Sequence, residues 1–143
     1  AMLLGPRDFV DEAVQWQRRQ GGTLHSALAN IVSAKMRLDQ QLERMPSYRK
    51  RAAEVAAIWN EFEGARTLPE EPQVNMFHLL LEGDGDQLLL ARDRAASEHG
   101  LWLVNYLNTE GDRARCEITI GDAALELADD ELRVAIGSFL QRD

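Results

Sequence analysis

The spacing of apolar residues changes at one loop of this 143-residue chain, residues 64–72, which contains two prolines. Before the loop, apolar residues recur three and four positions apart, a spacing typical of helices. After it they form short runs bounded by Gly, Asp and Asn, which is typical of strands and short helices. The chain is therefore predicted to be α+β, with helices over residues 1–66 and a small α/β domain over residues 67–143.

The first part predicts three helices in series. The first helix ends at Gly21-Gly22, and the second begins near Leu24. Pro46 is expected to stop the second helix, because proline lacks the N–H that a helix interior needs. Ser47 is then expected to cap the third helix, which continues to about residue 62.

The second part predicts the order strand, helix, strand, strand, helix. The expected strands are "VNMFHLLLE" (74–82), "LWLVNY" (101–106) and "RARCEITI" (113–120), the last two joined by a hairpin-type connection. One helix follows "GDGD" and ends at His99-Gly100, and the last helix covers residues 127–141. This order predicts a small, mainly antiparallel sheet covered by helices.

The charges are unevenly spread along the chain, whose net charge is −8. Residues 1–66 carry ten Lys and Arg against eight Asp and Glu, whereas residues 67–143 carry six against sixteen. Nucleic acid is therefore not an expected partner, because its phosphates require a dense basic surface. No apolar run approaches the length of a membrane span, and the single cysteine, Cys116, excludes an internal disulfide, so a cytoplasmic protein is expected.

Few residues offer catalytic chemistry. The three histidines share no metal-ligand spacing and the acids form no metal-binding motif, so no metal site is expected. Cys116 is expected to lie in the core as a small hydrophobe, because it alternates with Arg115 along a strand. No complete set of catalytic residues is present, which leaves two candidate binding features.

The first candidate is the corner "WQRRQGGTLHS", residues 16–26. Its two glycines free the backbone, and Thr23 can cap the helix that follows. Arg18, Arg19 and His25 surround the positive end of that helix, an arrangement that suits a phosphate or a carboxylate. The alternative is a plain corner between two helices.

The second candidate is Arg115, which shares one face of its predicted strand with Arg113, Glu117 and Thr119. An arginine on a rigid strand can hold a carboxylate through two hydrogen bonds. The alternative is a cross-strand ion pair on the protein surface.

Three segments together resemble one enzyme family. "MLLGPRDFVDEAVQWQRRQGGTLHSALANIVSA" resembles the segment that follows the catalytic lysine of threonine aldolases and aromatic amino acid β-eliminating lyases, which are fold-type-I pyridoxal-phosphate (PLP) enzymes. "VNMFHLLLEGD" resembles the strand that opens their small C-terminal domain, and "RARCEITIGD" resembles a later strand of that domain. The segments occur in the family's order, so the resemblance implies a C-terminal portion of such an enzyme.

The resemblance implies roles for three residues. Arg115 matches an arginine that binds the carboxylate of the amino-acid substrate, and Arg18 matches a basic residue that helps to hold the cofactor phosphate. His25 stands where many family members have an arginine with a similar phosphate-binding role, so His25 departs from the family's pattern.

The resemblance also implies what lies outside this sequence. The lysine that binds PLP as a Schiff base would precede Ala1, because Lys35 and Lys50 fall in other helices. The full-length enzyme is expected to be a PLP-dependent lyase that cleaves β-hydroxy-α-amino acids or eliminates at Cβ, and to be a homo-oligomer. The chain alone is expected to be inactive and to require an N-terminal large domain as partner.

A second interpretation comes from a different class of protein. The order strand, helix, strand, strand, helix is also half of a ferredoxin-like domain. A freestanding module of this kind would bind an amino acid or another protein, and fold alone does not decide between the two interpretations.

Overall fold

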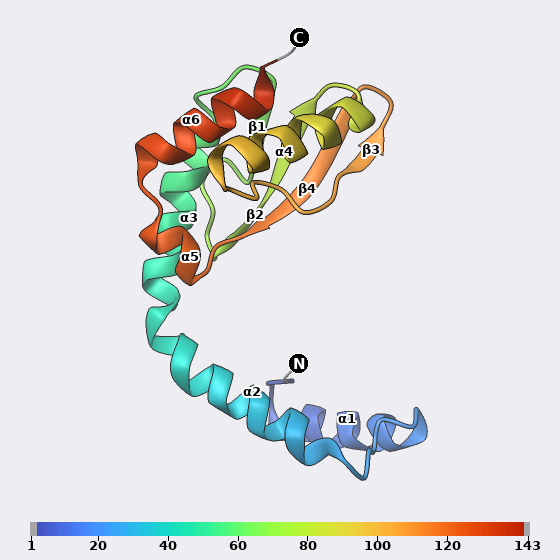
Figure 1. Ribbon diagram of the computed structural model, residues 1–143. Coiled ribbons are helices and arrows are strands. Elements are labelled where there is room, and N and C mark those ends of the chain that lie inside the picture. The colour runs from blue at the N-terminus through green and yellow to red at the C-terminus, as the bar shows by residue number, and fades with distance from the viewer. Residues whose placement is uncertain (1–2, 142–143) are drawn as a thin grey trace. The chain divides into compact units, whose positions relative to one another are not determined.

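The computed structural model describes residues 3–141, and the chain divides into two compact units, Ala1–Arg44 and Met45–Asp143 (Figure 1). The predicted boundary between residues 66 and 67 lies further along the chain. The two divisions differ because the third helix packs against the sheet and the last helix.

The first unit contains two helices, α1 (Arg7–Arg19) and α2 (Ala27–Gln41), followed by one 3₁₀ turn, η1 (Leu42–Arg44). Pro6 directly precedes α1 and has no N–H to leave unpaired there. No residue of α1 or α2 is buried, although both helices carry large apolar side chains. The helices of this unit therefore have no hydrophobic core of their own.

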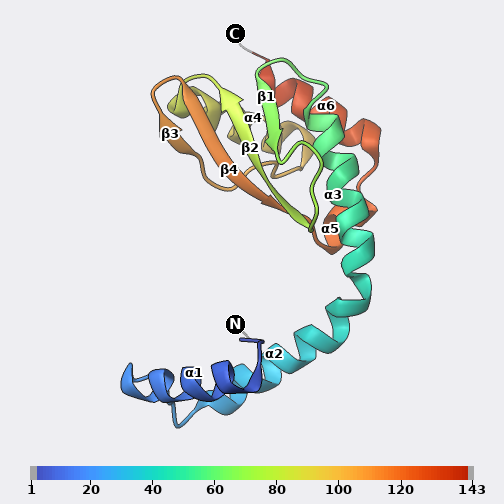
Figure 2. The same ribbon diagram turned by 180° about the vertical axis from the view of Figure 1, so that it is seen from behind.

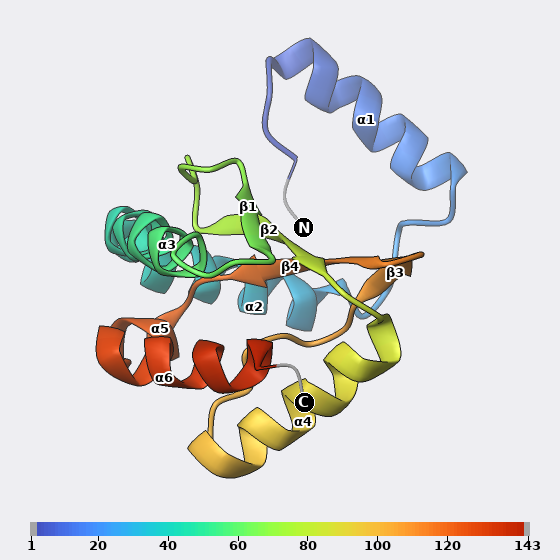
Figure 3. The same cartoon turned by 90° about the horizontal axis from the view of Figure 1, so that it is seen from above.

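The second unit is built on a four-stranded antiparallel sheet with the order β1-β2-β4-β3. The strands are β1 (Ala65–Leu68), β2 (Met76–Glu82), β3 (Asn108–Glu110) and β4 (Arg113–Thr119). The helices are α3 (Met45–Trp59), α4 (Gly85–His99), α5 (Asp122–Glu126) and α6 (Asp129–Leu140). Figure 3 shows α4 and α6 side by side on one face of the sheet, with α3 beside the β1 edge. The predicted α+β class is confirmed.

The core lies between the sheet and these helices. Every second residue of β2 is buried, and β4 buries Ala114 and Cys116 and half-buries Ile118, as expected for strands with one covered face. The rings of Trp59 and Phe139 meet edge to face at 6.0 Å, which joins α3 to α6. Burial of side chains of this size contributes roughly 1.5–3 kcal/mol each to stability.

Three local predictions are wrong. Residues 65–68, predicted as part of a loop, form β1 and pair with β2. Residues 101–106, predicted as a strand, form none, although Val104 is buried in the core. The boundary predicted at Pro46 and Ser47 is also wrong: α2 ends at Gln41 and α3 begins at Met45 with Pro46 in its first turn, so Pro46 does not stop the second helix and Ser47 does not cap the third.

The predicted order of the second part is otherwise confirmed, except that β3 starts at Asn108 in place of the expected strand at 101–106 and that the short helix α5, which was not predicted, precedes the last helix. The elements β2-α4-β3-β4-α6 have the strand arrangement of half a ferredoxin-like domain, and β1 adds an edge strand beside β2. Among the described residues, no helix is long and apolar enough to span a membrane.

Candidate anion-binding face of the sheet

The face of the sheet away from α4 and α6 carries exposed or half-buried side chains from all four strands. We call this the outer face; Figure 2 views the sheet from behind, and no helix of residues 45–141 covers this face. Its residues are Arg66, Leu68, Met76, His78, Leu80, Glu82, Asn108, Glu110, Arg113, Arg115, Glu117 and Thr119. The predicted sharing of one face by Arg113, Arg115, Glu117 and Thr119 is confirmed, because all four are exposed while Ala114 and Cys116 are buried.

Arg115 has no acid directly opposite it. Its partners across the strands are Leu80 on β2 and Asn108 on β3. Leu80 in turn lies opposite Arg66 on β1. These four residues form one row across the outer face, Arg66-Leu80-Arg115-Asn108, and the alternative of a cross-strand ion pair at Arg115 is therefore not found.

The neighbouring rows of the outer face do contain acids. Arg113 lies between Glu82 and Glu110, one on each adjacent strand. On the other side of the row, Glu117 lies opposite His78. Of the arginines on the outer face, only Arg66 and Arg115 have no acid in their own row.

The row lies in a shallow depression of about 730 Å³. Its lining comes from all four strands and includes Arg66, Arg113 and Arg115, with Leu80 and Asn108 between them and Glu82 and Glu110 at the row of Arg113. A depression with an aliphatic floor and arginines around it suits a small organic anion.

Buried neighbours hold both arginines of the row in place. Thr67 is buried beside Arg66, where its N–H donates to Asn60 Oδ1 at 2.8 Å and its hydroxyl accepts from Asn60 Nδ2 at 2.8 Å. Arg115 stands between buried Ala114 and Cys116. Burial raises the pKa of the Cys116 thiol to about 12, in keeping with the predicted core position of this residue. The strand positions that present the two arginines are therefore rigid.

The corner between α1 and α2 belongs to the first unit. Arg18 and His25 are both exposed there, and Arg19 lies over the Trp16 ring with its guanidinium carbon 5.2 Å from the ring centroid. The prediction that Thr23 caps a helix starting near Leu24 is wrong, because α2 begins at Ala27.

The backbone of this corner is hydrogen-bonded to itself. The N–H of Gly21 donates to the Arg18 carbonyl, and the N–H of Gly22 donates to the Gln17 carbonyl at 2.8 Å. These amides are therefore not available to an anion. The exposed side chains of Arg18 and His25 can still donate to a phosphate, so any contact from this corner would come from side chains.

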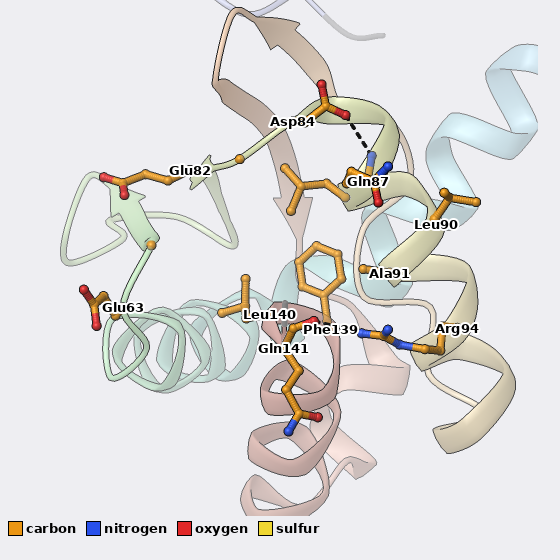
Figure 4. A pocket seen from close by; sticks show the side chains of 13 residues that line it. Glu63, Glu82, Asp84, Gln87, Leu90, Ala91, Arg94, Phe139, Leu140 and Gln141 are labelled. Atoms are coloured by element: carbon orange, nitrogen blue, oxygen red, sulfur yellow. Dashed lines mark hydrogen bonds between the residues drawn. The ribbon is translucent and has the colours of Figure 1, made fainter. Parts of the chain in front are cut away.

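A second hollow, of about 1010 Å³, lies beside the ends of α4 and α6 (Figure 4). Phe139 and Leu140 contribute apolar surface, and Glu63, Glu82 and Asp84 contribute acids. Two of its polar groups already have structural roles: Asp84 accepts from the N–H groups of Asp86 and Gln87 as the cap of α4, and Arg94 donates to the carbonyls of Ser138 and Gln141. This hollow offers little positive charge to a carboxylate or phosphate.

The remaining histidines are separated by the fold, with His78 on β2 and His99 in the last turn of α4. Within residues 3–141, no three His, Cys, Asp or Glu side chains gather as metal ligands. Sequence reasoning missed Arg66, because it lies in a four-residue strand inside a segment rich in loop formers. A signal was nevertheless present directly before Pro69: in an extended segment, Arg66 and Leu68 fall on one face and Thr67 falls on the other.

Comparisons with known proteins were made for both sequence and structure. No model of a protein family matches the sequence. No curated protein matches it either.

Two solved structures are similar to this chain. One is a protein of Exiguobacterium sp. 255-15 assigned as an aromatic amino acid β-eliminating lyase/threonine aldolase, with a TM-score of 0.81 and 33% sequence identity. The other is a protein of Listeria monocytogenes EGD-E assigned as an L-allo-threonine aldolase, with a TM-score of 0.81 and 32% identity. Each match covers 94% of this chain but only 38% of the solved chain. The resemblance seen in the sequence is thereby confirmed, and the chain is similar, over nearly its whole length, to the C-terminal part of the threonine aldolase/aromatic amino acid β-eliminating lyase family.

Proposed function

We propose that this chain is the C-terminal part of a PLP-dependent lyase that acts on amino acids. The reaction is threonine-aldolase-like cleavage of a β-hydroxy-α-amino acid, or elimination at Cβ. The similarity to the two solved structures supports this proposal, and the chain spans 38% of their length. The complete protein would be a cytoplasmic homo-oligomer whose N-terminal large domain joins residues 1–143.

In this proposal, Arg115 binds the carboxylate of the substrate. The observation that carries the assignment is its row on the outer face: Arg115 is exposed, rigidly placed, and flanked by Leu80 and Asn108 rather than by an acid. An unpaired guanidinium can give a carboxylate two charge-assisted hydrogen bonds. Arg115 would therefore orient the amino acid for reaction at its other end.

Arg18 and His25 would hold the phosphate of PLP in the complete enzyme. When bound, PLP supplies an electron sink that stabilises negative charge on the substrate. The side chains of this corner would position the cofactor by binding its phosphate. Arg18 is the stronger candidate, because a neutral imidazole adds little affinity for phosphate near pH 7.

The isolated chain would be inactive. Its two lysines, Lys35 and Lys50, are exposed and form surface ion pairs with Asp39 and Glu54. Neither lysine lines either of the two hollows described above. The lysine needed to bind PLP must therefore come from another part of the complete protein.

The test uses steady-state kinetics of the complete protein. Arg115→Ala should lower kcat/KM by roughly 30- to 1000-fold, which corresponds to about 2–4 kcal/mol, and should leave PLP occupancy unchanged. Arg18→Ala should instead weaken PLP retention, with activity partly restored by added PLP, and His25→Ala should have a smaller effect of the same kind. Arg49→Ala, which removes an exposed arginine from α3, is the matched control.

Two results would contradict the proposal. Unchanged kinetics for Arg115→Ala would show that another residue binds the carboxylate. Full PLP occupancy in Arg18→Ala would show that the corner between α1 and α2 does not contact the cofactor.

A further inference from the structure

The row Arg66-Leu80-Arg115-Asn108 places a second arginine in the same depression as Arg115. Adjacent strands are about 4.8 Å apart, so the Cα atoms of Arg66 and Arg115, two strands apart, are separated by about 10 Å. An arginine side chain is long enough for the two guanidinium groups to reach one small ligand above Leu80.

Neither arginine has a partner among residues 3–141. Arg66 and Arg115 form no salt bridge and no side-chain hydrogen bond within that part of the chain. Two adjacent, unpaired cations are notable here, because residues 45–143, which contain both arginines, carry nineteen Asp and Glu against ten Lys and Arg. Like charges held close on a rigid surface repel each other, and an anion between them removes that repulsion.

We propose that Arg66 is a second anion-binding residue of the outer face, and that the depression takes a dicarboxylate. One carboxylate binds Arg115, which rests on the role proposed above, and the other binds Arg66. The aliphatic side chain of Leu80, half-buried between the two arginines, contacts the methylene carbons that join the carboxylates. The substrate class indicated is an amino acid, or a product, with a second acidic group.

Arg113 is not the second contact, although it lines the same depression. Its row places Glu82 and Glu110 on either side of it. No ion pair joins Arg113 to either glutamate within residues 3–141, but two carboxylates beside Arg113 repel a second carboxylate of a ligand, whereas the row of Arg66 contains no acid. Arg113→Ala is therefore a control in the same depression, and Arg49→Ala is a control outside it.

The experiment is a titration of the 143-residue chain, followed by NMR of the arginine Nε–Hε groups, at constant ionic strength. Two five-carbon ligands are compared: glutarate, with two carboxylates, and valerate, with one. Glutarate should bind about tenfold more tightly than valerate, because it gains one additional charge-assisted contact. It should shift the resonances of both Arg66 and Arg115, whereas valerate should shift Arg115.

The variants separate the two arginines. Arg66→Ala should remove the tenfold advantage of glutarate and leave valerate binding unchanged, and Arg66→Lys should restore part of it. Arg113→Ala and Arg49→Ala should retain the advantage. Thermal unfolding of each variant checks that it is folded, and the exposed position of Arg66 leads us to expect midpoints near that of the parent chain.

Each remaining outcome has one meaning. Equal affinities for glutarate and valerate, or an advantage that survives in Arg66→Ala, would overturn the inference while leaving the role of Arg115 intact. A glutarate advantage that depends on Arg66, combined with unchanged kinetics of Arg115→Ala in the complete protein, would support a dicarboxylate site and count against the proposed lyase role of Arg115.

Discussion

Arg51 is the charged residue most deeply buried in the described part of the chain, with 8% of its surface exposed. Its guanidinium donates to the carbonyl of Ala124 at 2.9 Å and to that of Leu127 at 2.6 Å, and it forms an ion pair with Asp129. Burial lowers the pKa of Arg51, but hydrogen bonds to Asp129 and Glu54 outweigh this and raise the pKa overall. One side chain of α3 therefore fixes the segment that joins α5 to α6.

We expect Arg51→Ala to lower the free energy of unfolding by about 2–4 kcal/mol, because it leaves two carbonyls and one carboxylate without their partner. Arg49→Ala, two residues away and exposed, should change stability by less than about 0.5 kcal/mol. Urea unfolding followed by tryptophan fluorescence measures both variants. Equal stability of the two would show that the Arg51 contacts do not hold the fold.

Asp129 makes stability depend on pH. The hydrogen bond from Arg51 lowers the pKa of Asp129 in the folded chain. A lowered pKa contributes stability above the unfolded value, near 3.9, and this contribution is lost as pH falls through the folded value. The urea midpoint should therefore fall between about pH 4 and pH 2, and Asp129→Asn should reduce the slope. A parent midpoint that does not change over this range would contradict the prediction.

At the scale of elements, sequence periodicity predicted the longer helices and the two long strands, but not the short helix α5 or the short strands β1 and β3. β2 and β4 each alternate between more buried and more exposed residues over seven positions, which is a strong signal. β1 has only four residues, and its place in the sheet depends on Asn60 binding Thr67, a contact that periodicity does not encode.

The segment 101–106 shows the opposite error. Its apolar residues suggested a strand, but its backbone is held by a side chain instead: Arg92 donates to the carbonyl of Asn105 and stacks on Trp102 with its guanidinium carbon 4.4 Å from the ring centroid. For the candidate site, the alternation along β4 predicted the exposed position of Arg115. Arg66 could not be placed beside it, since the pairing of β1 with β2 was not predicted.

Two helical glycines form a matched pair for testing the packing of elements. A Cβ on Gly85, at the start of α4, would lie 2.0 Å from Thr109 Cγ2 on β3, whereas a Cβ on Gly137 in α6 would lie 3.7 Å from its nearest neighbour in Phe62. Gly85→Ala should therefore destabilise the chain by about 1–3 kcal/mol. Gly137→Ala should be neutral or stabilise it by up to about 1 kcal/mol, since alanine favours helices. Thermal unfolding compares them, and a stabilised Gly85→Ala would contradict the packing of α4 against β3.

At the scale of the whole molecule, the two units differ in what stabilises them. The second unit has a continuous core from α3 to α6, whereas the apolar side chains of the first unit, such as Leu28 and Ile31, are exposed. Exposed apolar patches of this kind mark surfaces that other chains or domains cover. The first unit is therefore expected to depend on a partner, consistent with the proposed large domain.

Hydrogen exchange of the isolated chain at low concentration tests this difference. Amides of α1 and α2 should exchange much faster than those of β2 and β4, because isolated helices of this length are marginally stable in water. Mass spectrometry of the exchanged peptides reports each element. Protection of α2 equal to that of β2 in a monomeric sample would contradict the prediction.

The most direct measurement is a crystal structure of the complete protein with its amino-acid substrate bound. We expect the substrate carboxylate to lie about 2.7–3.1 Å from the guanidinium nitrogens of Arg115. A substrate carboxylate held by other residues, with the Arg115 guanidinium out of contact, would contradict the proposed function of this chain.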